Sequence, residues 1–322
     1  MPKAKRMRAM SILLSVAVLI TILSAPGVSA QEVKAGDPAQ GAGGATVAAV
    51  SAILIDVTTG RVLFEQNPDQ RLAPASLTKI MTVALALEAV NDGKVGLNDP
   101  VTVSQNAVKL GGSTMFLEAG MKVPLLELLK GVTVVSGNDA STAVAEYVAG
   151  SEEFFIQLMN RRAAELGLSN THFTNSHGLD QENHYSSARD LATLTAYADR
   201  TFPLFVELHA MREMTFNKIT QPNRNGLLAA YPGADGVKTG MTNQAGYSLV
   251  ASAGREGMRL IAVILKAEGA TVREAEATKL LNYGFRNFET VKVLSKGDDL
   301  GEVQVRSGKE ETVGLVAEET LV

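Results

Sequence analysis

Apolar runs of strand length occur in two separate parts of the chain. Near the start, Ala49–Val57 and Arg61–Gln66 are rich in β-forming residues and are joined by a short turn that contains a glycine, which predicts a hairpin. Near the end, Asp235–Met241, Gly246–Ala253 and Met258–Ala267 follow one another as an antiparallel meander would. An isolated hairpin is only marginally stable. We therefore expect the two groups of strands to meet in one sheet.

Helical spacing dominates the segment between these strands. Ser76–Val90 carries apolar side chains all round, which is typical of a buried central helix. Further helical patterns cover 123–134, 140–149, 152–166 and 187–199, and a last one covers Val272–Phe288. This order predicts an α+β fold, in which an antiparallel sheet is flanked by helices and an all-helical subdomain is inserted between its strands.

The first thirty residues have the pattern of an export signal. A basic start is followed by an apolar run and by the small-x-small sequence Val28-Ser29-Ala30, so we interpret 1–30 as a signal peptide cleaved after Ala30. An uncleaved anchor is the alternative, but the apolar run is short for a membrane span. We therefore expect an exported protein that works in the periplasm or at the extracytoplasmic face of the cell wall.

The remaining segments divide by composition. Residues 31–46 are rich in Gly and Ala and predict a flexible lead-in, and 47–289 hold the strands and helices of the main domain. In 290–322 the pattern is short and charged, and alternating valines predict a partial C-terminal β domain. These valines are Val291, Val293, Val303 and Val305. No amphipathic anchoring helix is evident there, so we expect no clear membrane anchor.

Composition narrows the classes of function. The 322 residues are 46% hydrophobic and 20% charged, as in ordinary globular proteins. The absence of cysteine excludes disulfides, Cys-ligated metals and cysteine nucleophiles, and no compact set of the four histidines suggests a metal or another cofactor. The formal net charge is −4, and loss of the four basic residues of the signal would take it to −8. Nucleic acid is therefore not an expected partner.

Ser76-Leu77-Thr78-Lys79 is the first motif with candidate chemistry. At the start of a helix, side chains three residues apart share one face, so the Lys79 amine can reach the Ser76 hydroxyl. Burial and the helix dipole both lower the pKa of such a lysine, which favours a neutral amine able to act as a base. The alternative is a helix-capping serine followed by a solvated lysine.

Two further motifs extend this chemistry. Ser136-Gly137-Asn138 lies between two predicted helices, where a hydroxyl and a carboxamide can relay a proton and hold a substrate amide, although a plain helix cap is the alternative. Lys238-Thr239-Gly240 lies on a predicted strand. On an edge strand this sequence supplies a cation, a hydroxyl and a glycine that avoids a clash with an extended substrate. The alternative is that these three residues only form the end of a strand and a turn.

Taken together, Ser-x-x-Lys, Ser-x-Asn and Lys-Thr-Gly in this order form the known signature of penicillin-binding proteins and class A β-lactamases. The chain resembles the D-alanyl-D-alanine carboxypeptidases, which are low-molecular-mass penicillin-binding proteins, from about Ser51 to Thr290. The resemblance implies a β-lactamase/transpeptidase-like fold with a helical insertion. It also implies peptidoglycan stem peptides ending in D-Ala-D-Ala as substrates and β-lactam antibiotics as covalent inhibitors.

The resemblance also implies roles for individual residues. Ser76 would attack the penultimate D-alanine, Lys79 would be the base, and Ser136 would pass the proton to the leaving amine. The backbone N–H groups of Ser76 and Met241 would form the oxyanion hole. The substrate-binding set would be Asn138, Lys238, Thr239, Gly240, Arg224 and Arg273. Met241 departs from relatives that carry His there, which leaves the backbone donor but removes any role of a His side chain.

Several alternatives use or imitate the same site. A β-lactamase would need a loop glutamate to activate water, whereas the chain offers Arg189-Asp190-Leu191. We interpret Asp190 as a residue that braces its loop and His177 as a structural loop histidine. A peptidoglycan endopeptidase would differ in the leaving group alone. A non-catalytic wall-binding scaffold would not need the three motifs intact.

Overall fold

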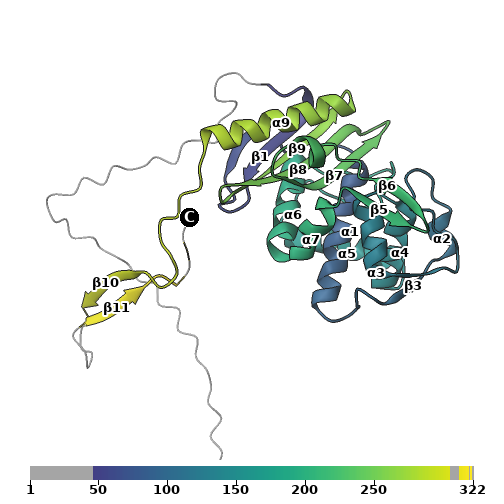
Figure 1. Cartoon of the computed structure of the whole chain (residues 1–322), viewed down its shortest axis with the longest axis horizontal. Helices are drawn as coiled ribbons and strands as arrows, with labels where there is room; N and C mark the ends of the chain where they lie inside the picture. Colours follow the sequence, from purple (N-terminus) through teal and green to yellow (C-terminus); the bar gives the residue numbers. More distant parts are fainter. Residues whose placement is uncertain (1–45, 305–311, 319, 321–322) are drawn as a thin grey trace, which may run out of the picture. The chain divides into compact units, whose positions relative to one another are not determined.

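The computed structural model describes residues 46–304, 312–318 and 320. Five strands form one antiparallel sheet in the order β2-β1-β9-β8-β7 (Figure 1). The strands are β1 (Ala49–Asp56), β2 (Val62–Gln66), β7 (Ala234–Thr242), β8 (Gly246–Arg255) and β9 (Met258–Ala267). β1 pairs with β9 through partners such as Ala52 and Ile264. The prediction that the two groups of strands meet in one sheet is therefore confirmed.

Both faces of the sheet are covered, because successive side chains of a strand point to opposite faces. Ile53 of β1 and Val263 of β9 belong to the core that faces the inserted helices. Their neighbours Leu54 and Ile264 belong to a second core beneath α9 (Ala270–Asn287). Figure 1 shows α9 along one side of the sheet, with α6 and α7 on the other side. Because the central strands are buried on both faces, they are mostly apolar rather than alternating.

The inserted region lies between β2 and β7. It contains a 3₁₀ turn, η1 (Ala75–Thr78), the helices α1 (Lys79–Asn91), α2 (Gln105–Val108), α3 (Leu125–Thr133), α4 (Asn138–Ala149), α5 (Glu152–Glu165), α6 (Ala188–Thr201), α7 (Pro203–Ala210) and α8 (Leu227–Ala230), and the strands β3 (Pro100–Thr102), β4 (Lys122–Pro124), β5 (Glu213–Phe216) and β6 (Ile219–Pro222). The predicted α+β class is confirmed, and the insertion is mainly helical.

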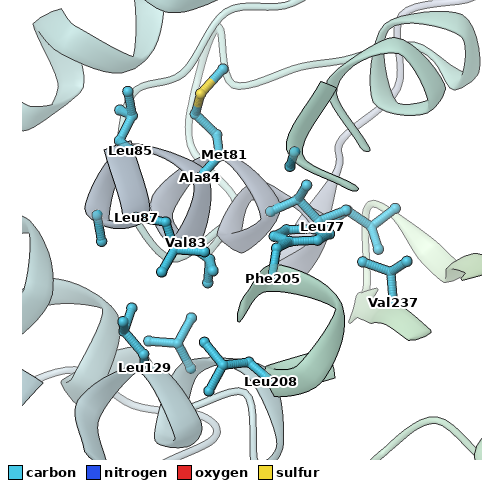
Figure 2. Close-up of a cluster of buried hydrophobic side chains, with 14 of the residues drawn as sticks. Leu77, Met81, Val83, Ala84, Leu85, Leu87, Leu129, Phe205, Leu208 and Val237 are labelled. Carbon is cyan, nitrogen blue, oxygen red and sulfur yellow. The ribbon is translucent and has the colours of Figure 1, made fainter. Parts of the chain in front are cut away.

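Helix α1 runs through the centre of this region, as its all-round apolar pattern predicts. Its side chains Met81, Val83 and Leu85 are buried. They lie in one cluster with Phe205 and Leu208 of α7 (Figure 2). The cluster fixes the helix relative to the sheet, so the residues at its N-terminus are held in a defined position.

Some elements were not predicted. β3 pairs with β4, and β5 pairs with β6, in two small antiparallel sheets, so the predicted all-helical insertion is wrong in this respect. These strands have three or four residues, which is too short for an alternating pattern to stand out. Helix α7 was also missed, although Pro203 occupies its first turn, a position that proline favours.

At the C-terminal end, β10 (Asp299–Gln304) pairs with β11 (Thr312–Val316). Val303 lies in β10, as expected. Val291 and Val293 lie outside any strand, so their predicted strand positions are wrong. Val305, the predicted signal peptide and all but the last residue of the lead-in fall outside the described residues. Within the described part of the chain, no helix combines the length and apolar character needed to cross a membrane.

Candidate active site

Ser76 and Lys79 meet at the junction of η1 and α1. Ser76 lies in the 3₁₀ turn, and Lys79 is the first residue of the α-helix. The three-residue spacing places both side chains on one side of the turn, with Lys79 Nζ 3.0 Å from Ser76 Oγ. Ala75, just before the serine, has a positive φ of 48° and is buried. The serine thus lies in a tight turn at the N-terminal end of the buried central helix.

The Lys79 amine lies in a fully enclosed polar environment. Its Nζ donates to Asn138 Oδ1 at 2.8 Å and to the His177 carbonyl at 2.5 Å. Burial, and next the charge of Lys238, lower the pKa of Lys79 well below its ordinary value, while Asp139 acts in the opposite sense. The neutral amine, which can accept a proton, is therefore favoured far more than in water.

The Ser136-Gly137-Asn138 motif lies where α3 gives way to α4. Ser136 has a positive φ of 63°. Asn138, the first residue of α4, is buried and donates from Nδ2 to the Gly111 carbonyl at 2.7 Å, while its Oδ1 accepts from Lys79. The asparagine thus connects the base to the loop before the motif and keeps a second amide hydrogen for another acceptor.

The Lys238-Thr239-Gly240 motif lies on a strand, β7, as the sequence predicts, and β7 is one of the two edge strands of the sheet. Lys238 is buried and donates from Nζ to the Thr239 carbonyl at 3.1 Å. Burial, followed by the charges of Arg273 and Arg224, lowers the pKa of Lys238 to about 7. At Gly240, a Cβ atom would lie 3.0 Å from the Pro74 carbonyl oxygen. The glycine therefore lets β7 approach the turn that carries the serine.

A cleft of about 210 Å³ brings most of the predicted residues together. Its lining consists of Ser76, Ser113, Ser136, Arg224, Thr239, Gly240, Met241, Tyr247 and Arg273. Three predicted residues, Lys79, Asn138 and Lys238, are buried and are not part of the lining. The cleft therefore has a hydroxyl-rich side around the serine and a cationic side.

Two lining residues, Ser113 and Tyr247, were not predicted. Ser113 lies in a loop, and its carbonyl accepts the Asn138 backbone N–H at 2.7 Å. Tyr247 pairs with Met241 in the β7–β8 register, so it lies next to the motif across the strands. Only the second could be inferred from the sequence, once the two strands were paired as a hairpin.

The cationic side consists of arginines from two different elements. Arg273 of α9 is buried, and its Nη1 donates to the Gly240 and Ser248 carbonyls at 3.3 and 3.4 Å. Its Nε has no hydrogen-bond partner among the described residues. Arg224 is exposed in the loop before α8. Together with Lys238 they create a positive field that favours an anionic group in the cleft.

The loop around His177 contacts the base through its backbone, which sequence reasoning did not predict. Asn175 Oδ1 accepts the N–H groups of His177 and Gly178, which holds the loop in the conformation where the His177 carbonyl accepts from Lys79. Burial, followed by Lys79, lowers the pKa of His177 to about 3. The imidazole is therefore neutral, and its 3.8 Å approach to Glu152 is not an ion pair. A backbone acceptor has no sequence signature.

Asp190, another candidate residue, is not part of the cleft lining. Asp190 accepts the Asn170 N–H and the Thr171 hydroxyl, at 2.8 and 2.7 Å, so it braces its loop as expected. In the described residues, no three His, Asp or Glu side chains are grouped as they would be around a metal ion.

The comparisons with known proteins agree with this geometry. Residues 37–269 match the family model described as D-alanyl-D-alanine carboxypeptidase. The chain is 44% identical over 277 residues to the D-alanyl-D-alanine carboxypeptidase DacF of Bacillus subtilis, covering 85% of this chain and 71% of that protein. The chain belongs to the D-alanyl-D-alanine carboxypeptidase family. DacA of Escherichia coli, another family member, is 45% identical over 274 residues, which are 83% of this chain and 68% of its own length.

The fold comparison places the chain in the same family. The crystal structure of penicillin binding protein 5 from Haemophilus influenzae has a TM-score of 0.82 and 43% identity, with 86% of this chain and 82% of that chain covered. Residues 288–322 match the family model described as Penicillin-binding protein 5, C-terminal domain. The carboxypeptidase family thus accounts for both the main domain and the short segment that follows it.

Proposed function

We propose that the chain is a serine-type D-Ala-D-Ala carboxypeptidase that removes the terminal D-alanine from peptidoglycan stem peptides through an acyl-enzyme on Ser76. The observation that carries this proposal is the 3.0 Å contact between the buried Lys79 amine and the Ser76 hydroxyl, beside a cleft with a cationic side. A nucleophile with its own base and a carboxylate-binding end are what this reaction needs.

The hydrogen bonds of Lys79 orient it as the base. A neutral amine has two N–H groups and one lone pair, and the Asn138 and His177 oxygens accept the two N–H groups. The lone pair is then directed at the Ser76 hydroxyl, which gives up its proton as Oγ bonds to the substrate carbonyl carbon. In deacylation, the same amine takes the proton of the attacking water.

The remaining roles follow from the cleft. The N–H groups of Ser76 and Met241 stabilise the oxyanion, a contribution typically worth about 3–4 kcal/mol. Ser136, which lines the cleft, passes the proton toward the leaving amine. The second amide hydrogen of Asn138 is available to the substrate's backbone carbonyl.

The terminal carboxylate of the substrate is assigned to the cationic side. Arg273 and Arg224 offer guanidinium groups that can bond both carboxylate oxygens, and Thr239 adds a hydroxyl. Lys238 contributes charge from beneath the strand. The exposed edge of β7 at Gly240 offers backbone groups to an extended peptide.

The cellular setting is part of the same proposal. Residues 1–30 direct export and 31–46 connect to the catalytic domain 47–289, so the enzyme meets stem peptides in the periplasm or at the cell-wall face. Residues 290–322 form part of a C-terminal β domain. In cell-wall biogenesis, trimming of stem peptides affects cell shape, and β-lactams block it by acylating Ser76.

The test uses the chain from Gln31 and a pentapeptide that ends in D-Ala-D-Ala, with Ser76→Ala as control. We expect the mass loss of one alanine together with free D-alanine, and neither in the control. Rapid turnover of penicillin without D-alanine release would identify a β-lactamase instead, and cleavage of cross-linked peptides alone would identify an endopeptidase.

A further inference from the structure

A chain of buried hydrogen bonds ends on the peptide group that carries the nucleophile's N–H. Thr78 Oγ1 donates to the Ala75 carbonyl at 2.8 Å, and it lies 2.8 Å from His184 Nε2. On its other side, His184 Nδ1 lies 2.9 Å from the backbone nitrogen of Thr174. Thr78 is completely buried, and His184 is 5% exposed.

The donor and the acceptor of each hydrogen bond in this series can be assigned. A backbone N–H can only donate, so His184 Nδ1 accepts from Thr174 and carries no proton. Burial, followed by the charge of His172, lowers the pKa of His184 to about 4, so the ring is neutral and its single proton is on Nε2. Nε2–H then donates to Thr78 Oγ1, whose own proton goes to the Ala75 carbonyl.

The final acceptor, the Ala75 carbonyl, links this series of hydrogen bonds to the nucleophile. The Ala75 carbonyl and the Ser76 N–H belong to one planar peptide group, in which they point in opposite directions. Fixing the carbonyl therefore fixes the N–H. Gly178 packs against the same carbonyl, since a Cβ there would lie 1.8 Å from the oxygen. Ala75 also has a positive φ of 48°, a conformation that needs support from its surroundings.

We infer that Thr78 and His184 are positioning residues that orient the Ala75–Ser76 peptide so that its N–H is directed at the developing oxyanion. This inference rests on the proposed function, because it gives that N–H the oxyanion role. Neither side chain is in the cleft lining, so they act through the peptide. Their effect is greatest where negative charge develops, in the transition state rather than in substrate binding.

The decisive experiment compares isosteric variants in the whole chain. Thr78→Val removes the hydroxyl and keeps the shape, Thr78→Ser keeps the hydroxyl, and Thr195→Val is the matched control. Thr195 is also completely buried and donates to a helix carbonyl, that of Leu191, at 2.6 Å, but it lies outside the cleft. Thermal melting of each variant reports the common cost of losing a buried hydroxyl.

Two readouts separate orientation from general damage. One is kcat and KM on the D-Ala-D-Ala peptide. The other is the affinity for a peptide boronic acid, in which Ser76 Oγ bonds to boron and a boron-bound oxygen occupies the oxyanion hole. For Thr78→Val we expect kcat to fall about 10–100-fold with KM within about threefold, and boronate affinity to fall by a similar factor. Thr78→Ser and Thr195→Val stay within about threefold of the wild type.

Variants of His184 test its hydrogen bond to Thr78. His184→Leu removes the donor to Thr78 and lowers kcat, whereas His184→Gln restores a donor at the same distance along the side chain and recovers most of the loss. Because the two residues act in series, the double variant Thr78→Val with His184→Leu is no worse than Thr78→Val alone. Fully additive losses would overturn the inference.

Two other results would also overturn it: a Thr78→Val enzyme within twofold of wild-type kcat, or one with reduced kcat but unchanged boronate affinity. If the wild type releases no D-alanine, the proposed substrate is wrong. The boronate affinities of the variants still decide the inference, since they depend only on the serine and its oxyanion hole.

Discussion

At the scale of single residues, two buried lysines have opposite tasks. Lys79 must be neutral to accept a proton, so activity rises with pH through its lowered pKa. Lys238 must be charged to attract a carboxylate, and its pKa is about 7. Below this value it is protonated, and above it the charge is lost. A lowered pKa at Lys79 therefore favours activity, whereas a lowered pKa at Lys238 limits activity at high pH.

We therefore predict an alkaline fall in kcat/KM that begins near pH 7 and belongs to Lys238. Lys238→Arg keeps its charge to high pH, so its fall moves upward by at least one pH unit, while the acid side set by Lys79 stays in place. The measurement is kcat/KM for the D-Ala-D-Ala peptide from pH 5 to 10, because this ratio reports groups of the free enzyme. Lys279→Arg, an exposed lysine of α9, is the control. An unchanged alkaline side in Lys238→Arg would assign the fall to another group.

The sequence identified most side chains of the site but not the backbone carbonyl that contacts the base. Ser76 and Lys79 are recognisable because their three-residue spacing at a helix start already brings them together. The His177 carbonyl, which accepts from Lys79, is not recognisable, since every residue has a carbonyl and only the loop conformation selects this one. Thr78 was part of the quoted motif, yet its hydroxyl gains a role only through a histidine 106 residues away.

At the scale of elements, the loop at Gly178 and the turn η1 are in backbone contact. Gly178 has a φ of 90°, and a Cβ there would lie 1.8 Å from the Ala75 oxygen and 2.4 Å from its carbon. Backbone atoms cannot rotate away as a flexible side chain can. A side chain at this position must therefore displace either the loop or the turn that carries the nucleophile.

Gly178→Ala is predicted to reduce acylation by penicillin at least about 100-fold and to lower the melting temperature. Gly167→Ala is the matched control, because Gly167 has a similar φ of 71° but nothing within 4 Å of its Cβ position. The control therefore shows only the strain of a positive φ, about 1 kcal/mol. Equal acylation rates in the two variants would mean that the loop does not constrain the serine.

Prediction of elements succeeded where patterns were long. The eighteen-residue α9 and the ten-residue strands β8 and β9 have enough positions for apolar spacing to be distinct. The strand pairs β3–β4 and β5–β6 do not, since their strands have three or four residues and are stabilised by the surrounding insertion. The meeting of the two groups of strands was predicted only from the need to complete a sheet, and the pairing of β1 with β9 that joins them has no local signal in the sequence.

At the scale of the whole molecule, buried neutral histidines connect the site to stability. The pKa values of His177 and His209 are lowered to about 3 and that of His184 to about 4, in each case chiefly by burial. In the unfolded chain a histidine titrates near 6.5. Between these values the unfolded state binds protons that the folded state refuses, so the stability that these three rings contribute is present above about pH 6.5 and is lost as the pH falls.

The expected loss is large enough to unfold the protein in mild acid. Each histidine contributes a slope that approaches about 1.4 kcal/mol per pH unit below pH 6.5, so three of them remove about 5 kcal/mol between pH 6.5 and pH 5, which is comparable with the whole stability of a small domain. Aspartates and glutamates of the unfolded chain titrate near 4, below most of this window. Urea unfolding at pH 8, 6.5, 5.5 and 5 measures the slope. His209→Asn, which cannot titrate, should reduce that slope by about one third. A free energy of unfolding that stays constant from pH 6.5 to 5 would show that the three rings take up protons without unfolding, and that the neutral state assigned to the residues around Lys79 is wrong.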